Sequence, residues 1–463
     1  MSTPAYTPPA NGFRTFLIVW ITQSISVFGS ALTFFGLNVW MVTVLYARPE
    51  QKAELAMALS ATTLAFGIPT LLLMPIAGAW ADRHDRKRTM IVTDLLNGLV
   101  SLLLMVLILS GLLNLWLLIG IMVIESVLGA FHGSAFDTSY AMLVPEAQLP
   151  RANGMMQTIW SLSGLLSPGI AAAVIGLPAI LRQNGLAGFL PGWSDGTPLL
   201  MAIDGVTFFL AALVLVFLFI PSPKRTDVDS QTGKVQVSMW ADIRQGALYI
   251  WHRRPMLWLL GTFTVCNFLT GPTGIFSTLL VKFNLQPDWS GLGFTIESAM
   301  ALLGSVASLG GVIGGVFISS WGGLKSRRVL GVLVPMIFLG LVMVGFGQSR
   351  WLYFSAAMIF LIDAMTPLMN SHSQAIWQIQ TPRELQGRVF SVRRVIAQIS
   401  WPVSTALVGW LGGLFDPGLV MSIFGVILTV FCTFQLFNPY LMRVEDKAYL
   451  DALAARYEAA PTN

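Results

Sequence analysis

Twelve long apolar runs separated by short polar segments dominate the pattern of residues along the chain. They cover residues 14–44, 55–80, 90–111, 114–142, 152–178, 197–220, 256–284, 296–320, 329–348, 351–378, 388–414 and 417–438. A helix that crosses the hydrocarbon core of a bilayer needs about 20 predominantly apolar residues. The pattern therefore predicts an all-α membrane protein with twelve transmembrane helices.

The longest polar stretch, residues 221–255, divides the runs six and six. Its second half carries apolar residues at helical spacing opposite Arg244 and Arg253, which predicts an amphipathic helix on the cytoplasmic membrane surface. These apolar residues are Met239, Trp240, Ile243, Ala247, Ile250 and Trp251. The predicted organisation is a tail (1–13), a six-helix bundle (14–220), the linker (221–255), a second bundle (256–438) and a C-terminal tail (439–463) with a short helix at 443–459.

Composition and charge sharpen the assignment. Of the 463 residues, 55% are hydrophobic and 11% are charged, against about 25% charged residues in soluble domains. This excludes a soluble or disordered chain. Of the 27 Lys and Arg residues, only Arg48, Lys52, Arg182, Lys282 and Arg350 fall outside one face of the predicted topology. The positive-inside rule then places both termini in the cytoplasm, in an inner membrane of the bacterial type, and assigns the net charge of +5 to loops rather than to nucleic-acid binding.

The two halves also echo one another. The segment GAWADRHDRKR, from Gly78 to Arg88, has a weaker copy, GGLKSRR, which begins at Gly322. Further on, VPEAQLPRANG of the first half matches QTPRELQGRV of the second. Internal repeats of this kind are typical of secondary transporters, whose halves move against each other around a central site.

The segment from Gly78 to Lys87 resembles the signature G-x-x-x-D-R-x-G-R-[RK] between the second and third helices of the major facilitator superfamily. The chain is most similar to the branch that contains the enterobactin exporter and the macrolide efflux proteins, on the segments LVPEAQLPRANGMMQ, IRQGALYIWHRRPMLW and LQGRVFSVRRVIAQ. The resemblance implies the major facilitator fold, with two pseudo-symmetric six-helix bundles.

The resemblance also implies a cytoplasmic gate, in which Asp82 caps the eleventh helix and basic residues hold the fourth. Asp85 departs from the family's Gly and could compete for Arg86 or His84. Alternatively, the segment is only a basic loop that sets orientation. The candidate gate residues are Gly78, Asp82, Arg83, Arg86, Lys87, Asp137, Arg393, Arg394, Gly322 and Arg327.

Two acids lie near the middle of apolar runs. Glu125 in the fourth run and Asp363 in the tenth are each on the order of 16 Å deep at 1.5 Å per residue. A charge at the bilayer centre costs at least about 2.5–3.5 kcal/mol, so both are functional candidates. Burial disfavours an ionised carboxylate, which suits these acids to take up and release a proton. The alternative is a structural hydrogen bond between helices.

Further polar residues share these faces. His132 follows Glu125 by seven residues, and Asn370 and Gln374 follow Asp363, so we expect them to face a cavity. In the first run, Gln23, Ser26, Ser30, Thr33 and Asn38 are candidates to line a path, although small polar residues also serve helix packing. Asp94, Asp137 and Arg393 are expected in gate salt bridges, and Asp204 and Glu297 in an outer latch.

These patterns favour a proton-coupled exporter of amphipathic small molecules such as drugs, macrolides or siderophores. The segment SGLLSPG in the fifth run resembles a degraded antiporter motif, and no Walker A pattern is present. The alternatives are an importer or facilitator of a metabolite and a lipid or lysolipid flippase. Without an H-E-x-x-H or G-x-S-x-G pattern, we expect no enzyme activity, metal or cofactor. The expected partners are the small-molecule substrate, protons and the lipid bilayer, for a monomeric protein.

Overall fold

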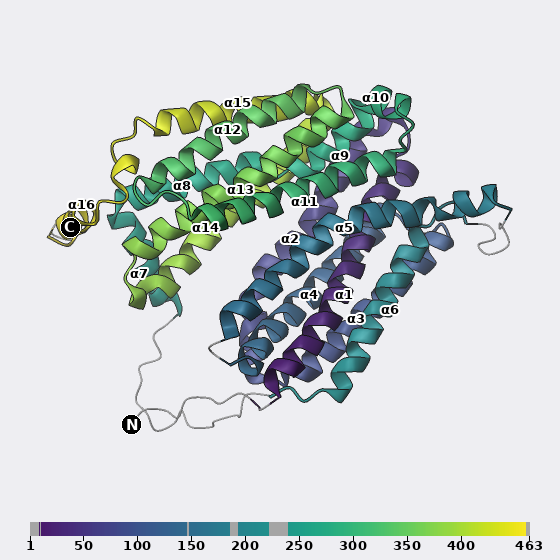
Figure 1. Cartoon of the computed structure of the whole chain (residues 1–463), viewed down its shortest axis with the longest axis horizontal. Coiled ribbons are helices and arrows are strands. Elements are labelled where there is room, and N and C mark those ends of the chain that lie inside the picture. Colours follow the sequence, from purple (N-terminus) through teal and green to yellow (C-terminus); the bar gives the residue numbers. More distant parts are fainter. Residues whose placement is uncertain (1–8, 10, 146–147, 186–192, 222–238, 460–463) are drawn as a thin grey trace. The chain divides into compact units, whose positions relative to one another are not determined.

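The computed structural model describes residues 9, 11–145, 148–185, 193–221 and 239–459 (Figure 1). All regular structure in these ranges is helical. Within them, twelve spans are long and apolar enough to cross a membrane. Each begins and ends within a few residues of one of the twelve apolar runs, which confirms the predicted transmembrane helices.

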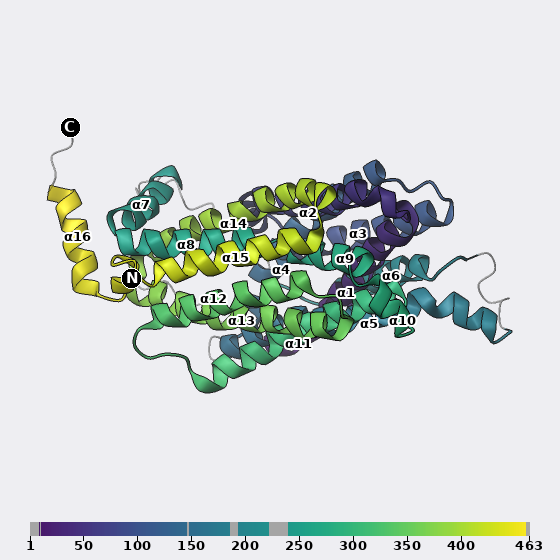
Figure 2. The same ribbon diagram turned by 90° about the horizontal axis from the view of Figure 1, so that it is seen from above.

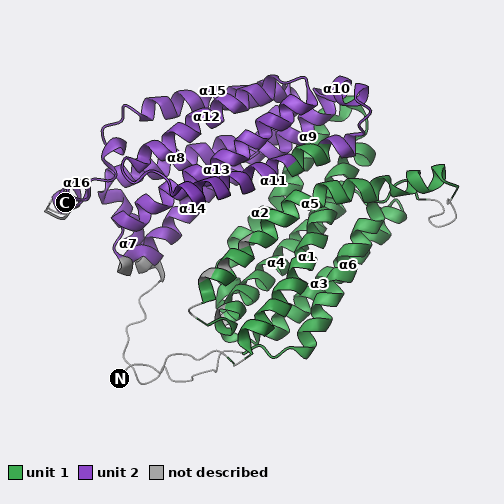
Figure 3. Cartoon of the chain, in the orientation of Figure 1, with its two compact units in different colours: residues 1–230, 300–305 green, residues 231–299, 306–463 purple. Residues whose placement is uncertain are grey.

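The chain divides into two compact units (Figure 3). We call residues 1–230 and 300–305 the N-terminal bundle, and residues 231–299 and 306–463 the C-terminal bundle. The N-terminal bundle is built from the first six long helices. These are α1 (Gly12–Trp40), α2 (Lys52–Arg83), α3 (Arg86–Leu109), α4 (Leu115–Leu143), α5 (Leu149–Gln183) and α6 (Thr197–Phe217). Short π and 3-10 segments, Met41–Leu45 and Pro49–Gln51, connect α1 to α2.

The C-terminal bundle contains the remaining spans, apart from residues 300–305 of α11, and three described helices outside them. The helices are α7 (Met239–His252), α8 (Arg254–Thr270), α9 (Thr273–Phe283), α10 (Gln286–Gly291), α11 (Ile296–Trp321), α12 (Arg328–Gln348), α13 (Leu352–Gln380), α14 (Arg383–Leu414), α15 (Pro417–Gln435) and α16 (Lys447–Ala459). A single run was expected over 256–284, but it is divided into α8 and α9 at Gly271 and Pro272. Pro272 has no backbone N–H to donate to the carbonyl four residues earlier, so one hydrogen bond of the helical ladder is missing at this point.

Close approach of backbones holds several of these helices together. In the N-terminal bundle, α3 packs on α6 and α2 packs on α4. In the C-terminal bundle, α12 packs on α15, and a Cβ at Gly340 of α12 would lie only 2.7 Å from the carbonyl oxygen of Gly425. Small residues at such contacts let transmembrane helices gain van der Waals energy that larger side chains would prevent.

Two of the helices outside the spans, α7 and α16, lie at the same end of the C-terminal bundle (Figure 2). The Tyr249 hydroxyl on α7 donates a 2.6 Å hydrogen bond to the carbonyl of Gln380, and the Gln380 amide donates to the carbonyl of Glu445. Burial raises the pKa of Tyr249, so its hydroxyl remains a donor at neutral pH. Arg253 pairs with Asp451 of α16 at 3.2 Å. The linker helix and the tail are thus joined to the C-terminal bundle by specific polar contacts.

Replacing Gly340 by Ala tests the close packing of α12 on α15. The added methyl group would press on the Gly425 carbonyl and on Thr429, so we expect Gly340→Ala to destabilise the protein by about 1–3 kcal/mol. Thermal unfolding of the purified protein in detergent measures the change. Gly120→Ala is the matched control, since Gly120 is exposed on α4 and no described heavy atom lies within 4 Å of an added Cβ. Equal melting temperatures for the two variants would contradict the packing.

Candidate functional site

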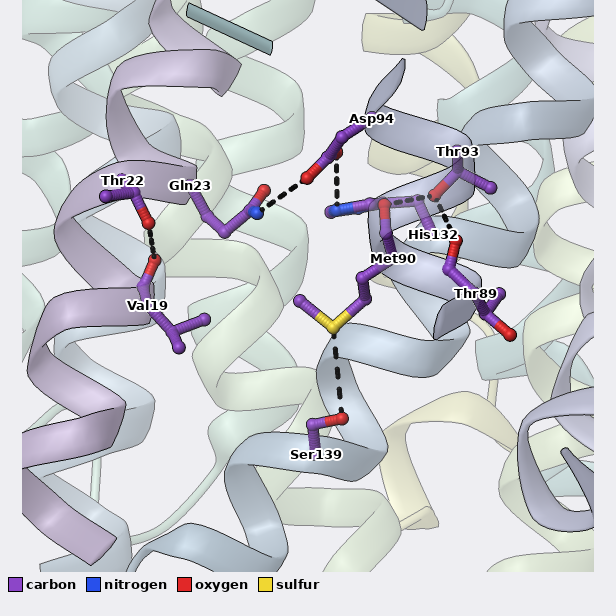
Figure 4. Close-up of polar contacts among 9 residues, drawn as sticks. All are labelled: Val19, Thr22, Gln23, Thr89, Met90, Thr93, Asp94, His132 and Ser139. Carbon is purple, nitrogen blue, oxygen red and sulfur yellow. Dashed lines mark hydrogen bonds and ion pairs between the residues drawn. The ribbon is translucent and has the colours of Figure 1, made fainter. Parts of the chain in front are cut away.

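A buried carboxylate lies where α1, α3 and α4 meet (Figure 4). Asp94 of α3 is fully buried, and its Oδ1 lies 3.0 Å from Nε2 of His132 on α4. Its Oδ2 accepts a 3.1 Å hydrogen bond from the side-chain amide of Gln23 on α1. Both carboxylate oxygens therefore have a polar partner, and each partner comes from a different helix. We call these three residues the Asp94 cluster.

Local helix geometry places this cluster inside the bundle. Asp94 is the ninth residue of α3, about 12 Å along the axis from Arg86. Gln23 points inward from α1 and is 1% exposed. On one side the cluster adjoins apolar core that includes Met90 and Phe136, and the His132 and Phe136 rings are 6.2 Å apart. This apolar contact lowers the local dielectric constant and strengthens the polar interactions of Asp94.

The cluster can exchange one proton without rearrangement. A neutral imidazole has one protonated and one unprotonated ring nitrogen, so His132 can take up a second proton while its Nε2 stays within 3.0 Å of Asp94. Uptake of that proton changes the net charge of the His132 and Asp94 pair from −1 to 0. The His132 side chain is 16% exposed, whereas that of Asp94 is 0% exposed. The imidazole is therefore the member of the pair through which a proton can enter.

The partners of Asp94 differ from those expected from the sequence. Asp94 was expected in a gate salt bridge, but in the described structure its partners are Gln23 and His132. His132 was expected to face a cavity on the same helix face as Glu125, and in the structure its Nε2 lies against Asp94. The repeat of polar residues at 94, 97 and 101 was a signal in the sequence that one face of α3 is buried and polar.

Glu125 and Asp363 are half-buried on α4 and α13. Among the described residues, neither forms a side-chain hydrogen bond or ion pair. Asn370 is exposed, and the structure does not join it to Asp363. Gln374 accepts a 2.7 Å hydrogen bond from Arg393, whose guanidinium lies 5.1 Å from the Trp377 ring centroid.

Another polar candidate of α1, Asn38, lies apart from the Asp94 cluster. The Asn38 amide donates to the carbonyl of Phe34 within its own helix. Among the candidates for coupling or substrate binding, the described structure brings His132 and Gln23 together around Asp94. The roles assigned to Glu125, Asp363, Asn370, Gln374 and Asn38 stay predictions.

Two of the basic gate residues, Arg86 and Lys87, make contacts inside the N-terminal bundle. Arg86 is buried, and it donates to the carbonyls of Ala81 and Thr138, which joins the end of α2 to α4. Lys87 donates a 2.8 Å hydrogen bond to the carbonyl of Val216 at the end of α6. Five other candidate gate residues are exposed, half-buried or have side chains outside the described residues. Arg83, Asp137 and Arg394 are exposed, Gly78 is half-buried, and the side chain of Asp82 lies outside the described residues.

Asp85 acts as a helix cap. Its Oδ1 accepts a 3.0 Å hydrogen bond from the backbone N–H of Arg88 in the first turn of α3, and its Oδ2 lies 3.8 Å from the Arg88 guanidinium. The His84 ring stacks on Trp80 at 3.6 Å. The competition of Asp85 for Arg86 or His84, considered from the sequence, is therefore absent from the described structure. The carboxylate stabilises the N-terminus of α3 instead.

The weaker copy of the signature forms the turn between α11 and α12. Gly322 ends α11 with a φ of 80°, and Arg327 precedes α12 with a φ of 52°. His372 of α13 holds this turn, because its Nε2 accepts the backbone N–H of Leu324 and its Nδ1 donates to the carbonyl of Leu368. A cavity of about 140 Å³ lies beside it.

Substitution of Asp85 separates its capping role from its charge. Asp85→Ala removes the cap, and we expect a loss of about 1 kcal/mol in stability. Asp85→Asn removes the charge but keeps a good capping oxygen, so it is expected to stay within a few tenths of a kcal/mol of the unmodified protein. Thermal unfolding of the purified variants provides the comparison. Equal losses for the two variants would show that the charge of Asp85, which both variants remove, stabilises α3 and that the capping oxygen does not.

Comparisons with known proteins agree with this architecture. The sequence model of the Major Facilitator Superfamily matches residues 19–405. Macrolide efflux protein A of Streptococcus pyogenes is 23% identical over 396 residues, which cover 85% of this chain and 88% of that protein. The multidrug efflux pump Tap of Mycolicibacterium fortuitum is 25% identical over 400 residues, which cover 82% and 87% of the two chains.

Solved structures share the fold. The inward-facing, unoccupied structure of a bacterial homologue of the human lysosomal transporter Spinster has a TM-score of 0.61 at 15% identity, and the match covers 97% of each chain. A bacterial homologue of the iron transporter ferroportin, in an inward-facing state, has a TM-score of 0.59 at 14% identity, over 91% of this chain and 98% of that one. At these identities the likeness extends to the fold alone.

Proposed function

The chain belongs to the Major Facilitator Superfamily, and from that premise we propose that it is a proton-coupled exporter of amphipathic small molecules such as macrolides, other drugs or siderophores. It is a multi-pass membrane transporter with efflux pumps among its relatives, and it is not an enzyme. In this proposal the two bundles expose a central site to either side of the membrane in turn.

The Asp94 cluster is the feature of the structure that best supports the proposed proton coupling. A fully buried carboxylate inside a membrane span is costly unless it is neutralised or hydrogen-bonded. Here the compensating partners include an imidazole, the side chain best suited to exchange a proton near neutral pH. Because Gln23 and His132 lie on α1 and α4, a change in the charge of the cluster alters contacts between three helices. A proton can thus bias the conformation of the bundle.

Efflux is the proposed direction because the similar proteins whose names state a direction are efflux proteins. Glu125 and Asp363 are proposed to contact a cationic substrate or a second proton, since each is a half-buried acid in the middle of a span. We further propose that the protein is a monomer in a bacterial-type inner membrane. Its basic loop at Arg83, Arg86 and Lys87 would face the cytoplasm, as would both termini.

Transport in proteoliposomes tests the proposal. The purified full-length chain is reconstituted, and erythromycin accumulation is measured with an imposed proton gradient and, separately, as exchange without one. We expect Asp94→Asn and His132→Gln to lower gradient-driven accumulation at least tenfold while exchange stays within about twofold, because a cluster without its exchangeable proton still allows the substrate to cross. Glu125→Gln and Asp363→Asn are measured beside them to separate substrate binding from coupling.

Asp195→Asn is the matched control. Asp195 lies outside the spans, where its side chain accepts the backbone N–H of Thr197, and an Asn oxygen can keep that bond. We expect full gradient-driven transport in this variant. Proton-driven accumulation that persists in Asp94→Asn, His132→Gln and their double variant would rule out the Asp94 cluster as the coupling site. Erythromycin movement that ignores the proton gradient in the unmodified protein would reject proton coupling itself.

A further inference from the structure

A second buried acid, Asp204, lies on α6 where α1 and α3 pack against it. Its side chain is 2% exposed. Oδ1 accepts a 3.1 Å hydrogen bond from the hydroxyl of Ser30 on α1, and Oδ2 accepts a 2.9 Å hydrogen bond from the hydroxyl of Ser101 on α3. From the sequence Asp204 was expected in an outer latch with Glu297. In the structure it is instead enclosed within the N-terminal bundle by hydroxyl groups.

In the described structure, no cationic side chain pairs with Asp204. The helices that pack against α6 are α1, α3 and α5. Apart from Asp94, their ionisable residues lie near helix ends and are Arg14, Arg86, Lys87, Arg88, Arg151 and Arg182. On α4, Glu125 is close enough to Asp204 for the two carboxylates to interact electrostatically, and two negative charges repel each other. An ionised Asp204 therefore has hydroxyl dipoles but no counter-charge, which is a costly arrangement in an apolar bundle.

The hydroxyl of Ser101 can serve either protonation state of Asp204. Its Oγ lies 2.9 Å from Asp204 Oδ2 and also 3.1 Å from the backbone carbonyl oxygen of Asn97. When Asp204 is ionised, Ser101 donates its one hydrogen to the carboxylate. When Asp204 is protonated, the new O–H can donate to Ser101 Oγ, and Ser101 turns its hydrogen to Asn97. Both states are fully hydrogen-bonded, and no heavy atom has to move.

Buried polar residues connect this site with the Asp94 cluster. On α3, Ser101 follows Asp94 by seven residues, about 10 Å along the same helix face. On α1, the polar residues of this set are three or four residues apart, so they share one face of the helix. The connecting residues are Gln23, Ser26, Ser30 and Thr33 of α1 and Asn97 of α3. A polar seam thus runs inside the N-terminal bundle between the two acids.

We infer that Asp204 is a second proton-binding residue of the N-terminal bundle, with Ser101 as the hydroxyl that adjusts to its protonation. One proton from water forms an O–H bond on a carboxylate oxygen, and release returns that proton to water and the charge to Asp204. The inference rests on the proposed proton coupling for its place in transport. Proton binding itself needs only the arrangement of Asp204, Ser30 and Ser101.

Infrared spectroscopy of the full-length protein tests the inference without any substrate. Spectra are recorded at a series of pH values, and the carbonyl stretch of protonated carboxyl groups is followed. We expect the unmodified protein to lose intensity in this region as the pH rises. Asp204→Asn should remove one component of that signal. Ser101→Ala should keep the component but shift its frequency, because the hydrogen-bond acceptor is lost.

Controls make each outcome decisive. Ser110→Ala is matched to Ser101→Ala, because the Ser110 hydroxyl bonds only carbonyls of α3 itself, at the exposed end of the helix, and it should leave the spectrum unchanged. An unchanged spectrum in Asp204→Asn overturns the inference. If that variant does not fold, an unshifted spectrum in Ser101→Ala overturns it. Loss of the Asp204 component on adding Na⁺ at fixed pH would identify a sodium site and also overturn it.

The transport assay separates this inference from the proposed function. In erythromycin-loaded proteoliposomes, Asp204→Asn is expected to lower the drug gradient that a given proton gradient supports, while part of the coupling remains through the Asp94 cluster. Normal coupling in Asp204→Asn, together with a lost infrared component, would overturn the role of Asp204 in transport and leave the proposed function intact. Absence of coupling in the unmodified protein would instead reject the proposed function.

Discussion

The cost of placing charge in an apolar environment governs the interior of this protein. With only 11% charged residues, the chain keeps nearly all of its charges at helix ends and in loops. A fully buried carboxylate needs compensation, since an unpaired buried charge is far less stable than the same charge in water. Asp94 is compensated by an imidazole and an amide, and Asp204 by two hydroxyls. Asp94 has one ionisable partner, His132, whereas the hydroxyl partners of Asp204 do not ionise near neutral pH. A proton can therefore bind to the partner of Asp94, but near Asp204 it must bind to the carboxylate itself.

Close helix packing makes these arrangements possible. In the N-terminal bundle, the backbone of Gly98 on α3 approaches Gly205 on α6, and this contact lies between Asp94 and Ser101 along α3. Larger residues at these positions would separate the helices and open the acids to lipid or water. The same closeness means that a change of charge at Asp94 or Asp204 is felt by two neighbouring helices. Helices joined through a titratable group can then respond together to proton binding.

Much of the fold was predictable because the bilayer imposes a simple rule on sequence. A span must be apolar over about 20 residues, and the twelve apolar runs became twelve helical spans. The division of the seventh run at Gly271 and Pro272 was not predicted, although Pro272 carries the reason in its missing N–H. Asp85 shows a different limit. The family pattern suggested competition for a basic neighbour, whereas the local backbone offered a free helix N-terminus that an acid caps well.

The sequence by itself determined the membrane architecture, the family and the short set of polar residues that had to be functional candidates. It placed Gln23, Asp94, His132 and Asp204 inside or at the ends of apolar runs, but it could not pair them. Periodicity shows which face of one helix a residue occupies, and says nothing of the neighbour that this face meets. Only the tertiary structure decided that His132 lies against Asp94, and that hydroxyls rather than a cation contact Asp204. The reason is that pairing depends on the rotation and depth of whole helices, which packing sets.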